Sequence, residues 1–376
     1  MRSRWPIIVV SVALAGWTGY WLAGTAAPKR PAPQGDVKSQ TSPRRTVMAD
    51  DDAPIFRRGE RAPKFPRDDA ALDAGALPGQ RILIFNDQAA LDEFLKRAGD
   101  RIRLMGRLDA LNALRVAFFN PDDLAFLLDG EAQESFVYPV DIPPAPGNGT
   151  AQEGAVALGA GLLDWLGVSG DNSTWGSGVK IAVLDTGVTA NSAFTSKISS
   201  INLVDLPSDP TTQNGHGTGV ASMIIGNGEL TPGVAPGASI ISIRVANDLG
   251  QSDSFMLAKG IVAAVDAGAR LINVSLGSPG DSGLVRNALA YARDAGAMIV
   301  AAAGNNGTDS VSYPAANEGV IAVGAVDALG NHLDFSNTGR QVAVSAPGFG
   351  VNAAWVGDQA ASVSGTSFSS PIVVGA

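Results

Sequence analysis

The chain has 376 residues, 45% of them hydrophobic, so it is long enough for more than one domain with a sizeable core. Its net charge of −9 is uneven, because residues 1–80 are net basic and the remainder is acidic, which argues against nucleic acid as the main partner. The sequence contains no cysteine, which excludes cysteine nucleophiles, thiolate metal sites and disulfides without fixing the compartment.

The N-terminal segment predicts export. Arg2 and Arg4 precede an apolar run over residues 5–26, which is long enough to span a bilayer and longer than the usual core of a signal peptide. Small residues at its end would allow cleavage, whereas its aromatic residues suit a membrane interface. Residues 1–26 are therefore expected to be a cleaved signal peptide or an uncleaved anchor, with the rest of the chain outside the cytoplasm.

Two segments precede the main body. Residues 27–80 are rich in Pro, Arg, Asp and Ala without periodicity, and are expected to be a disordered tether. Residues 81–141 read as strand, helix, strand, strand, helix, strand, which suits a small ferredoxin-like α+β domain. The expected strands are residues 81–85, 102–108, 113–119 and 135–140, and the expected helices are residues 88–99 and 121–128.

Residues 142–160 break this pattern with Pro and Gly and are expected to be a linker. From residue 161 to residue 376, near-continuous apolar strands alternate with amphipathic helices. This pattern predicts an α/β domain with a mostly parallel sheet covered by helices on both faces. Functional residues in such sheets lie at the carboxyl ends of strands, and Asp185 ends the strand at residues 179–185.

Asp185 begins an Asp-Thr-Gly segment that three chemistries could use. A paired-aspartate protease needs a second such segment, and the candidate at residues 281–283 follows Pro-Gly in a loop of an α/β pattern. An aspartyl-phosphate enzyme needs an acid two residues later, where Gly187 stands. Both alternatives fit poorly, which leaves a Ser-His-Asp hydrolase.

The remaining alternative needs an accessible histidine and a serine on a sharp turn. His216, one of two histidines, lies between glycines at the expected start of a helix. Ser367 lies in a Gly-led turn into a helix, with Pro371 expected in the first turn. A helix N-terminus favours nearby negative charge, which suits the oxyanion of acyl transfer.

Three segments carry a resemblance to a known family. VLDTGV (183–188), NGHGTGVAS (214–222) and SGTSFSSP (364–371) resemble, in the same order, the signature segments of the subtilisin-like serine proteases. The resemblance extends from about Gly161 to the last residue. It implies the α/β subtilisin-like fold and the hydrolysis of peptide bonds.

The resemblance implies a role for each matching residue. Ser367 would attack the scissile carbonyl, His216 would take its proton and later protonate the leaving amine, and Asp185 would orient the imidazole. AAAGNNG (301–307) resembles the oxyanion segment of the family, which implies that Asn305 donates from its side chain beside the main-chain N–H of Ser367.

Substrate recognition is implied by further short matches. SLG (275–277) resembles the strand with which an extended substrate pairs. The uncharged pocket argues against a strict preference for a basic residue before the cut, and Ser312 in place of a common glycine should make the pocket shallower. LGQSDS (249–254) lacks the bulky aromatic residue of the family, so the next subsite is expected to be open. The expected substrate-binding residues are Ser275, Leu276, Gly277, Ala302, Ala303, Gly304 and Ser312.

Residues 81–141 resemble, in pattern and position, the inhibitory propeptide of the family. The resemblance implies that this domain holds its tail in the cleft until self-cleavage within residues 142–160; an ordinary accessory domain is the alternative. The implied partners are polypeptide substrates, the chain's own propeptide and, if the N-terminus is uncleaved, the membrane. No cofactor is implied for catalysis, and although calcium stabilises many relatives, no acidic loop here identifies ligands.

Ala376 lies nine residues after Ser367, whereas the serine of the family opens a long central helix. The chain is therefore expected to be a fragment of a longer product, with its activity as it stands left open. The competing function is an anchored pseudoprotease or peptide-binding module that uses residues 275–277 without turnover. The presence of all three triad residue types argues against loss of activity by substitution.

Overall fold

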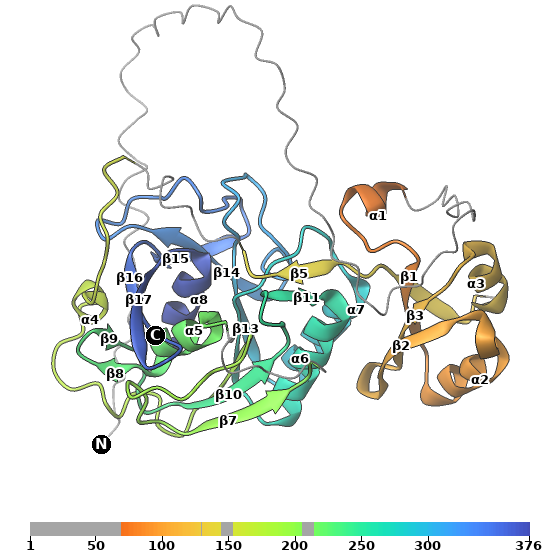
Figure 1. The fold of residues 1–376 in the computed structure, drawn as a ribbon, viewed down its shortest axis with the longest axis horizontal. Coiled ribbons are helices and arrows are strands. Elements are labelled where there is room, and N and C mark those ends of the chain that lie inside the picture. Colours follow the sequence, from red (N-terminus) through yellow and green to blue (C-terminus); the bar gives the residue numbers. More distant parts are fainter. Residues whose placement is uncertain (1–68, 129, 144–152, 205–213) are drawn as a thin grey trace, which may run out of the picture. The chain divides into compact units, whose positions relative to one another are not determined.

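The computed structural model describes residues 69–376, except residue 129 and residues 144–152 and 205–213 (Figure 1). The expected export segment at residues 1–26 lies outside these ranges, as does most of the expected tether. The end of the tether includes a short helix, α1 (Asp69–Asp73). Within the described ranges, no helix combines the length and the apolar character needed to cross a bilayer.

An N-terminal domain follows α1. Its elements are β1 (Gln80–Phe85), α2 (Gln88–Ala98), the 3₁₀ turn η1 (Gly99–Arg101), β2 (Arg103–Leu108), the 3₁₀ turn η2 (Asp109–Leu111), β3 (Ala113–Ala117), α3 (Pro121–Leu128) and β4 (Ala132–Ser135). The strands form an antiparallel sheet in the order β2-β3-β1-β4. This order of elements confirms the ferredoxin-like prediction.

The closing strand of this domain differs from the prediction. β4 ends at Ser135, whereas the expected strand covered residues 135–140. The apolar residues Val137 and Val140 are buried in a core that they share with residues of the second domain, and Pro139 begins another strand, β5 (Pro139–Asp141). The predicted strand was wrong because these apolar side chains pack against the second domain and not in the sheet of the N-terminal domain.

The two faces of the N-terminal sheet pack differently. On β1, Leu83 and Phe85 join Phe94 in the core beneath α2 and α3. The alternate residues, Ile82 and Ile84, belong to a core that continues into helices α6 and α7 of the second domain. Burial of both faces of the sheet therefore explains why β1 is apolar on both sides.

The second domain contains the remaining elements. They are α4 (Leu162–Trp165), β6 (Lys180–Asp185), β7 (Ile198–Asn202), α5 (His216–Ile225), β8 (Asn227–Gly228), β9 (Thr231–Pro232), β10 (Ser239–Arg244), β11 (Gln251–Asp253), α6 (Ser254–Asp266), β12 (Leu271–Val274), α7 (Gly283–Asp294), β13 (Met298–Ala302), β14 (Val320–Val326), β15 (Val342–Pro347), β16 (Val351–Trp355), β17 (Gln359–Val363) and α8 (Thr366–Gly375). Seven strands form a parallel sheet in the order β15-β14-β13-β12-β6-β10-β7.

Helices cover both faces of this sheet, as the sequence predicts. On β6, Ala182 and Leu184 belong to the core shared with α6 and α7, whereas Ile181 and Val183 belong to the core shared with α5 and α8. Helices α5 and α8 lie side by side (Figure 1). The carboxyl end of β6 therefore delivers Asp185 beside the first residues of α5.

Part of the expected linker pairs with the second domain. Leu158 and Gly159 donate their N–H groups to the carbonyls of Phe349 and Gly350, at 3.0 and 2.8 Å. Nearby, the N–H of Val156 donates to the carboxylate of the buried Asp327 at 3.1 Å. These contacts fix the start of the second domain against its last strands.

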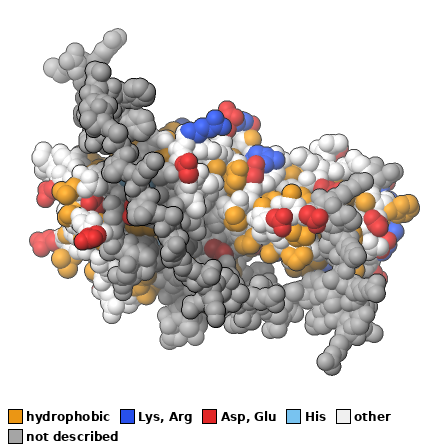
Figure 2. All heavy atoms as spheres, turned by 90° about the horizontal axis from the view of Figure 1, so that it is seen from above, with side chains coloured by type: hydrophobic (Ala, Val, Ile, Leu, Met, Phe, Trp, Pro, Cys, Tyr) orange, Lys and Arg blue, Asp and Glu red, His pale blue; other side chains and the backbone are white. Residues whose placement is uncertain are grey.

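The exposed charges contribute little to this architecture. Figure 2 shows acidic side chains dispersed over the visible face, several of them beside basic ones. Arg97, for example, pairs with Glu131, and Arg107 pairs with Asp92. Such exposed pairs contribute only about 0–1 kcal/mol each, so the buried clusters hold the fold together.

Candidate active site

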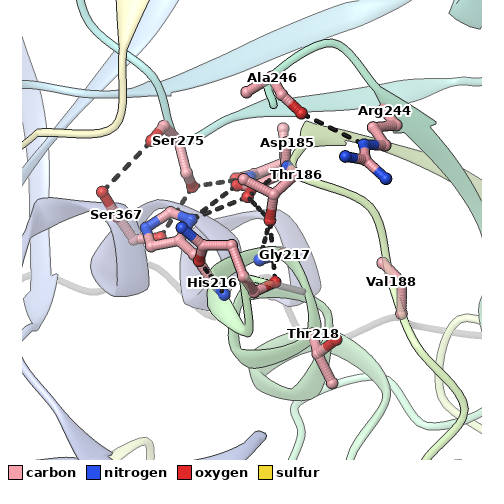
Figure 3. Close-up of polar contacts among 12 residues, drawn as sticks. Asp185, Thr186, Val188, His216, Gly217, Thr218, Arg244, Ala246, Ser275 and Ser367 are labelled. Carbon is pink, nitrogen blue, oxygen red and sulfur yellow. Dashed lines mark hydrogen bonds and ion pairs between the residues drawn. The ribbon is translucent and has the colours of Figure 1, made fainter. Parts of the chain in front are cut away.

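A buried acid–histidine pair lies at the carboxyl edge of the sheet. Asp185 is fully buried at the end of β6, and His216 begins α5 (Figure 3). The N–H at Nδ1 of His216 donates to Asp185, at 2.8 Å from Oδ1 and 3.0 Å from Oδ2. This contact fixes the tautomer, because a carboxylate accepts only, and so leaves Nε2 as the basic nitrogen of the neutral ring.

Neighbouring groups hold the carboxylate in place. Oδ1 of Asp185 accepts hydrogen bonds from the N–H and the hydroxyl of Thr186, at 2.8 and 3.2 Å. The Thr186 hydroxyl also accepts from the N–H of Gly217, at 3.2 Å. A side chain at Gly217 would clash with the carbonyl of Gly187, which explains the glycine directly after the histidine.

The serine lies on the neighbouring helix. Ser367 is the second residue of α8 and is 1% exposed. Its hydroxyl donates to the carbonyl of Ser275 at 3.3 Å, and Nε2 of His216 is buried without a hydrogen-bond partner among the described residues. The structure therefore brings Asp185, His216 and Ser367 together without a Ser367–His216 hydrogen bond. Such bonds are often long or unformed before a substrate is positioned.

The carbonyl of Ser367 has an unusual partner. Pro371 lies in the second turn of α8, so its expected place in the first turn was wrong. Because proline lacks an N–H, Ser367 loses the donor that a helix normally supplies four residues later. The hydroxyl of Ser275 donates to this carbonyl instead, at 2.8 Å (Figure 3).

Further buried hydrogen bonds extend this contact between Ser275 and helix α8. The Ser370 hydroxyl donates to Oδ1 of Asn273 at 2.8 Å, and Nδ2 of Asn273 donates to the Ser275 hydroxyl at 2.9 Å. Asn273, Ser275 and Ser370 are each 0% exposed. Helix α8 is therefore joined to the end of β12 both at Ser367 and one turn later.

Asn305 is held by the start of α8. Its Oδ1 accepts from the N–H and the hydroxyl of Thr366, at 2.9 and 2.8 Å. A Cβ on Gly365, which has φ +140°, would lie 2.8 Å from Nδ2 of Asn305. The amide oxygen is thus fixed toward the helix, and the amide nitrogen lies beside the residue two before Ser367.

The expected pocket residues fall into two groups. Ser312 lies beside Gly277 and Gly304, at positions where a Cβ on either glycine would contact its side chain, and its N–H donates to the carbonyl of Ala303 at 2.9 Å. The side chains of Leu276, Ala302 and Ala303 are buried, those of Leu276 and Ala303 in the core shared with α6 and α7. Asn337, which the sequence did not suggest, donates to Ser312 at 3.4 Å.

A hollow of about 220 Å³ lies beside His216 and Ser367, and none of the expected substrate-binding residues is among the described residues that line it. His216, Asn305 and Ser367 line it together with three residues that sequence reasoning missed: Trp355, Val363 and Phe368. The ring of Trp355 packs where side chains at Gly215 and Gly219 would clash. Two glycines four residues apart on one helix face were the signal that an aromatic ring packs there.

The tail of the N-terminal domain, residues 139–143, enters the same region. β5 pairs antiparallel with β11, and Asp141 forms an antiparallel bridge with Gly277. Ile142 packs over Gly250, where a Cβ would lie 2.9 Å from its Cδ1. Ile142 and Pro143 also line the hollow beside Ser367, so this tail lies in the candidate cleft.

The described residues contain no group of three or more His, Cys, Asp or Glu side chains placed to hold a metal ion. The functional groups at the site are a hydroxyl, an imidazole, a carboxylate and an amide. Together these groups can activate an oxygen nucleophile and stabilise a developing oxyanion.

Comparisons with known proteins agree with this geometry. The subtilase family model matches residues 176–376. The chain is 32% identical to the alkaline protease of Alkalihalobacillus alcalophilus over 305 residues, covering 78% of each protein. It is 39% identical to Subtilisin Savinase of Lederbergia lenta over 205 residues, covering 54% of this chain and 75% of that protein.

Among solved structures, a mutant of the protease domain of PatA matches with a TM-score of 0.51 and 35% identity, covering 55% of this chain and 80% of that one. The family model, the identities and the shared fold lead to the same assignment. The chain belongs to the subtilase family, the subtilisin-like serine endopeptidases.

Proposed function

We propose that the chain is an exported serine endopeptidase that cleaves polypeptides through Asp185, His216 and Ser367. The observation that carries the proposal is the buried pair of hydrogen bonds between His216 Nδ1 and Asp185, next to the serine that opens α8. Nε2 of His216 takes the proton of the Ser367 hydroxyl as Oγ adds to the scissile carbonyl carbon. The carbon–nitrogen bond then breaks as His216 protonates the leaving amine, and water hydrolyses the acyl-enzyme.

Asn305 completes the proposed chemistry. Nδ2 of Asn305 and the main-chain N–H of Ser367 are the proposed donors to the oxyanion. The two hydrogen bonds from Thr366 to Oδ1 support this role, because they orient the amide before the reaction begins.

An extended polypeptide is the proposed substrate. The pairing of the tail with Gln251 and Gly277 supports this proposal, because a substrate strand could form the same main-chain hydrogen bonds. The proposed pocket of Gly277, Ala303, Gly304 and Ser312 carries no charge, so we propose a preference for small or uncharged residues before the cut.

We also propose that residues 81–141 are an inhibitory propeptide, removed by self-cleavage within residues 142–160, of which residues 144–152 lie outside the described ranges. Packing of Ile82 and Ile84 into the core of α6 and α7 supports this role. So does the alignment with the alkaline protease, which at 78% of this chain is too long to fit within residues 161–376. Export is proposed from the basic and apolar residues 1–26.

The test uses the two histidines of the chain. His216→Ala should abolish hydrolysis of an unfolded protein substrate, whereas His332→Ala, which alters the exposed histidine, should leave it unchanged. Equal activity in the two variants would refute the proposed triad. Binding of a peptide without hydrolysis by the unmodified chain would favour the peptide-binding alternative.

A further inference from the structure

The tail of the N-terminal domain is the middle strand of an antiparallel arrangement. On one side, Asp141 lies opposite Gln251. On the other, Asp141 exchanges both main-chain hydrogen bonds with Gly277, at 3.0 and 2.8 Å. One residue later, the N–H of Ile142 donates to the carbonyl of Gly250 at 2.9 Å, in the register set by β11.

This register places the next residue. With Asp141 opposite Gly277, an antiparallel pair puts Ile142 opposite Leu276 and Pro143 opposite Ser275. Hydrogen-bonded pairs alternate, so Pro143 and Ser275 occupy the next position at which the two strands would exchange hydrogen bonds.

Pro143 cannot complete that exchange, because it has no N–H. The Ser275 carbonyl instead accepts the hydroxyl of Ser367, at 3.3 Å. Pro143 is buried, its Cγ lies 3.8 Å from the position of a Cβ on Gly277, and it lines the hollow with Ser367 and Asn305. Pro143 is therefore the tail residue that the register brings to the serine.

The residue after Pro143 in the sequence is also a proline. Resting on the proposed function, we propose that the docked tail presents the peptide bond after Pro143 to Ser367, and that this Pro-Pro bond resists the chain's own serine. The tail then acts as an inhibitor that is not cut in the register in which it binds. Self-cleavage must use another bond, after the tail leaves this register.

Two features of the bond explain its resistance. The nitrogen of Pro144 is a tertiary amide nitrogen, so ring carbon Cδ occupies the position of the hydrogen that other residues carry there. His216 must deliver its proton to this crowded nitrogen for the carbon–nitrogen bond to break. Pro143 also forfeits the hydrogen bond to Ser275 that would anchor the residue before the cut.

The same prolines favour binding. Proline has a fixed φ, and a residue that precedes proline is restricted to extended conformations. The segment from Ile142 to Pro143 is therefore already close to the strand geometry that pairing requires. Less conformational entropy is lost on docking, which strengthens inhibition while the bond stays intact.

The test replaces the second proline in the full chain. Pro144→Ala converts the tertiary amide into an ordinary one without changing a described residue of the tail. Pro146→Ala, in the same segment, is the matched control. Products are identified by intact mass and by N-terminal sequencing, each in parallel with Ser367→Ala.

We expect the Pro144→Ala chain to release a fragment that ends at Pro143, at least about tenfold faster than the unmodified chain or Pro146→Ala. This product should be absent when Ser367 is alanine. Release of that fragment by the unmodified chain at a similar rate would overturn the inference. So would Ser367-dependent cuts at other bonds, with none after Pro143 in Pro144→Ala, because the register would then be wrong although the chain is a protease. Absence of every Ser367-dependent cut, in the chain and in an added unfolded protein, would instead remove the proposed function and this inference with it.

Discussion

The hydroxyl of Ser275 donates a 2.8 Å hydrogen bond to the main-chain carbonyl of Ser367. Pro371 makes this bond necessary, since it withholds the N–H that would otherwise reach the same carbonyl within α8. The nucleophile candidate is thus positioned from outside its own helix, by the strand that is proposed to pair with substrate.

Ser275→Ala should lower both stability and turnover. It leaves the buried carbonyl of Ser367 without its donor, which costs about 1–3 kcal/mol in the free energy of unfolding. We expect a lower kcat with a nearly unchanged KM, because the hydroxyl positions Ser367 without contacting substrate. Ser196→Ala, which removes a hydroxyl bonded to the carbonyl of Pro236, is the matched control and should leave kcat unchanged. Equal kcat values in both variants would contradict the positioning role.

Asn305→Asp should reduce kcat by about 10²–10³-fold. The carboxylate still accepts from Thr366 at the position of Oδ1, but it has no N–H with which to stabilise the oxyanion. Asn306→Asp alters an exposed neighbour and serves as the control. A comparable kcat in the two variants would show that Asn305 is only a structural contact of α8.

Arg115→Ala should weaken the proposed inhibition of the catalytic domain by the N-terminal domain. Its Nη1 lies 2.7 Å from Oδ2 of Asp253, joining the N-terminal domain to the start of α6. Asp253 keeps its capping bonds from Phe255 and Met256, so α6 stays capped. Within the N-terminal domain, the variant also loses the 3.0 Å hydrogen bond from Nε of Arg115 to Oε1 of Gln80. Peptide hydrolysis by the intact chain should rise by about tenfold or more. Arg107→Ala removes an exposed pair within the N-terminal domain and should have no such effect; an equal rise there would contradict the account.

Ser312→Gly should shift specificity toward larger residues before the cut. The Ser312 side chain lies between Gly277 and Gly304, and its removal deepens the pocket. The ratio of kcat/KM for a bulky over a small residue should rise by about tenfold. Ser310→Gly, at an exposed position, should leave that ratio unchanged. An unaltered ratio in Ser312→Gly would place the pocket elsewhere.

Asp327→Ala should destabilise the fold in a pH-dependent way. Burial raises the pKa of Asp327, but hydrogen bonds from the N–H groups of Asn331, Val156 and Leu329 outweigh it and hold the pKa below its usual value. Because the folded pKa is the lower one, the stabilisation is complete above the unfolded value of about 4 and is lost as pH falls through the folded value.

The free energy of unfolding of Asp327→Ala should therefore fall by about 1–3 kcal/mol at pH 7, with a smaller deficit below about pH 4. Denaturant unfolding across this pH range measures the deficit. Asp294→Ala, which alters an exposed carboxylate, is the control. A deficit that stays constant down to strongly acidic pH would contradict the role of the ionised carboxylate.

The sequence was sufficient to predict the parallel sheet and the proximity of Asp185, His216 and Ser367. Apolar strands and amphipathic helices alternate clearly, and each of the three residues stands at the end of a strand or the start of a helix. These are local signals, and the topology of a parallel sheet brings them to one edge.

The remaining features depend on contacts between distant segments. The apolar character of Val137 and Val140 suggested one continuous strand, but their side chains pack against the second domain. Trp355 and Asn337 belong to no local motif, and they reach the site only through the packing of α5 and the contacts of Ser312. The register of Pro143 likewise depends on pairing with residues more than a hundred positions later.

The most direct test of the central claim compares two buried serines of α8. Ser367→Ala and Ser369→Ala each remove one hydroxyl from the same helix, and only the first removes the proposed nucleophile. Hydrolysis of an unfolded protein should fall by at least about 10⁴-fold in Ser367→Ala and remain close to that of the unmodified chain in Ser369→Ala. Full activity in Ser367→Ala would contradict the account.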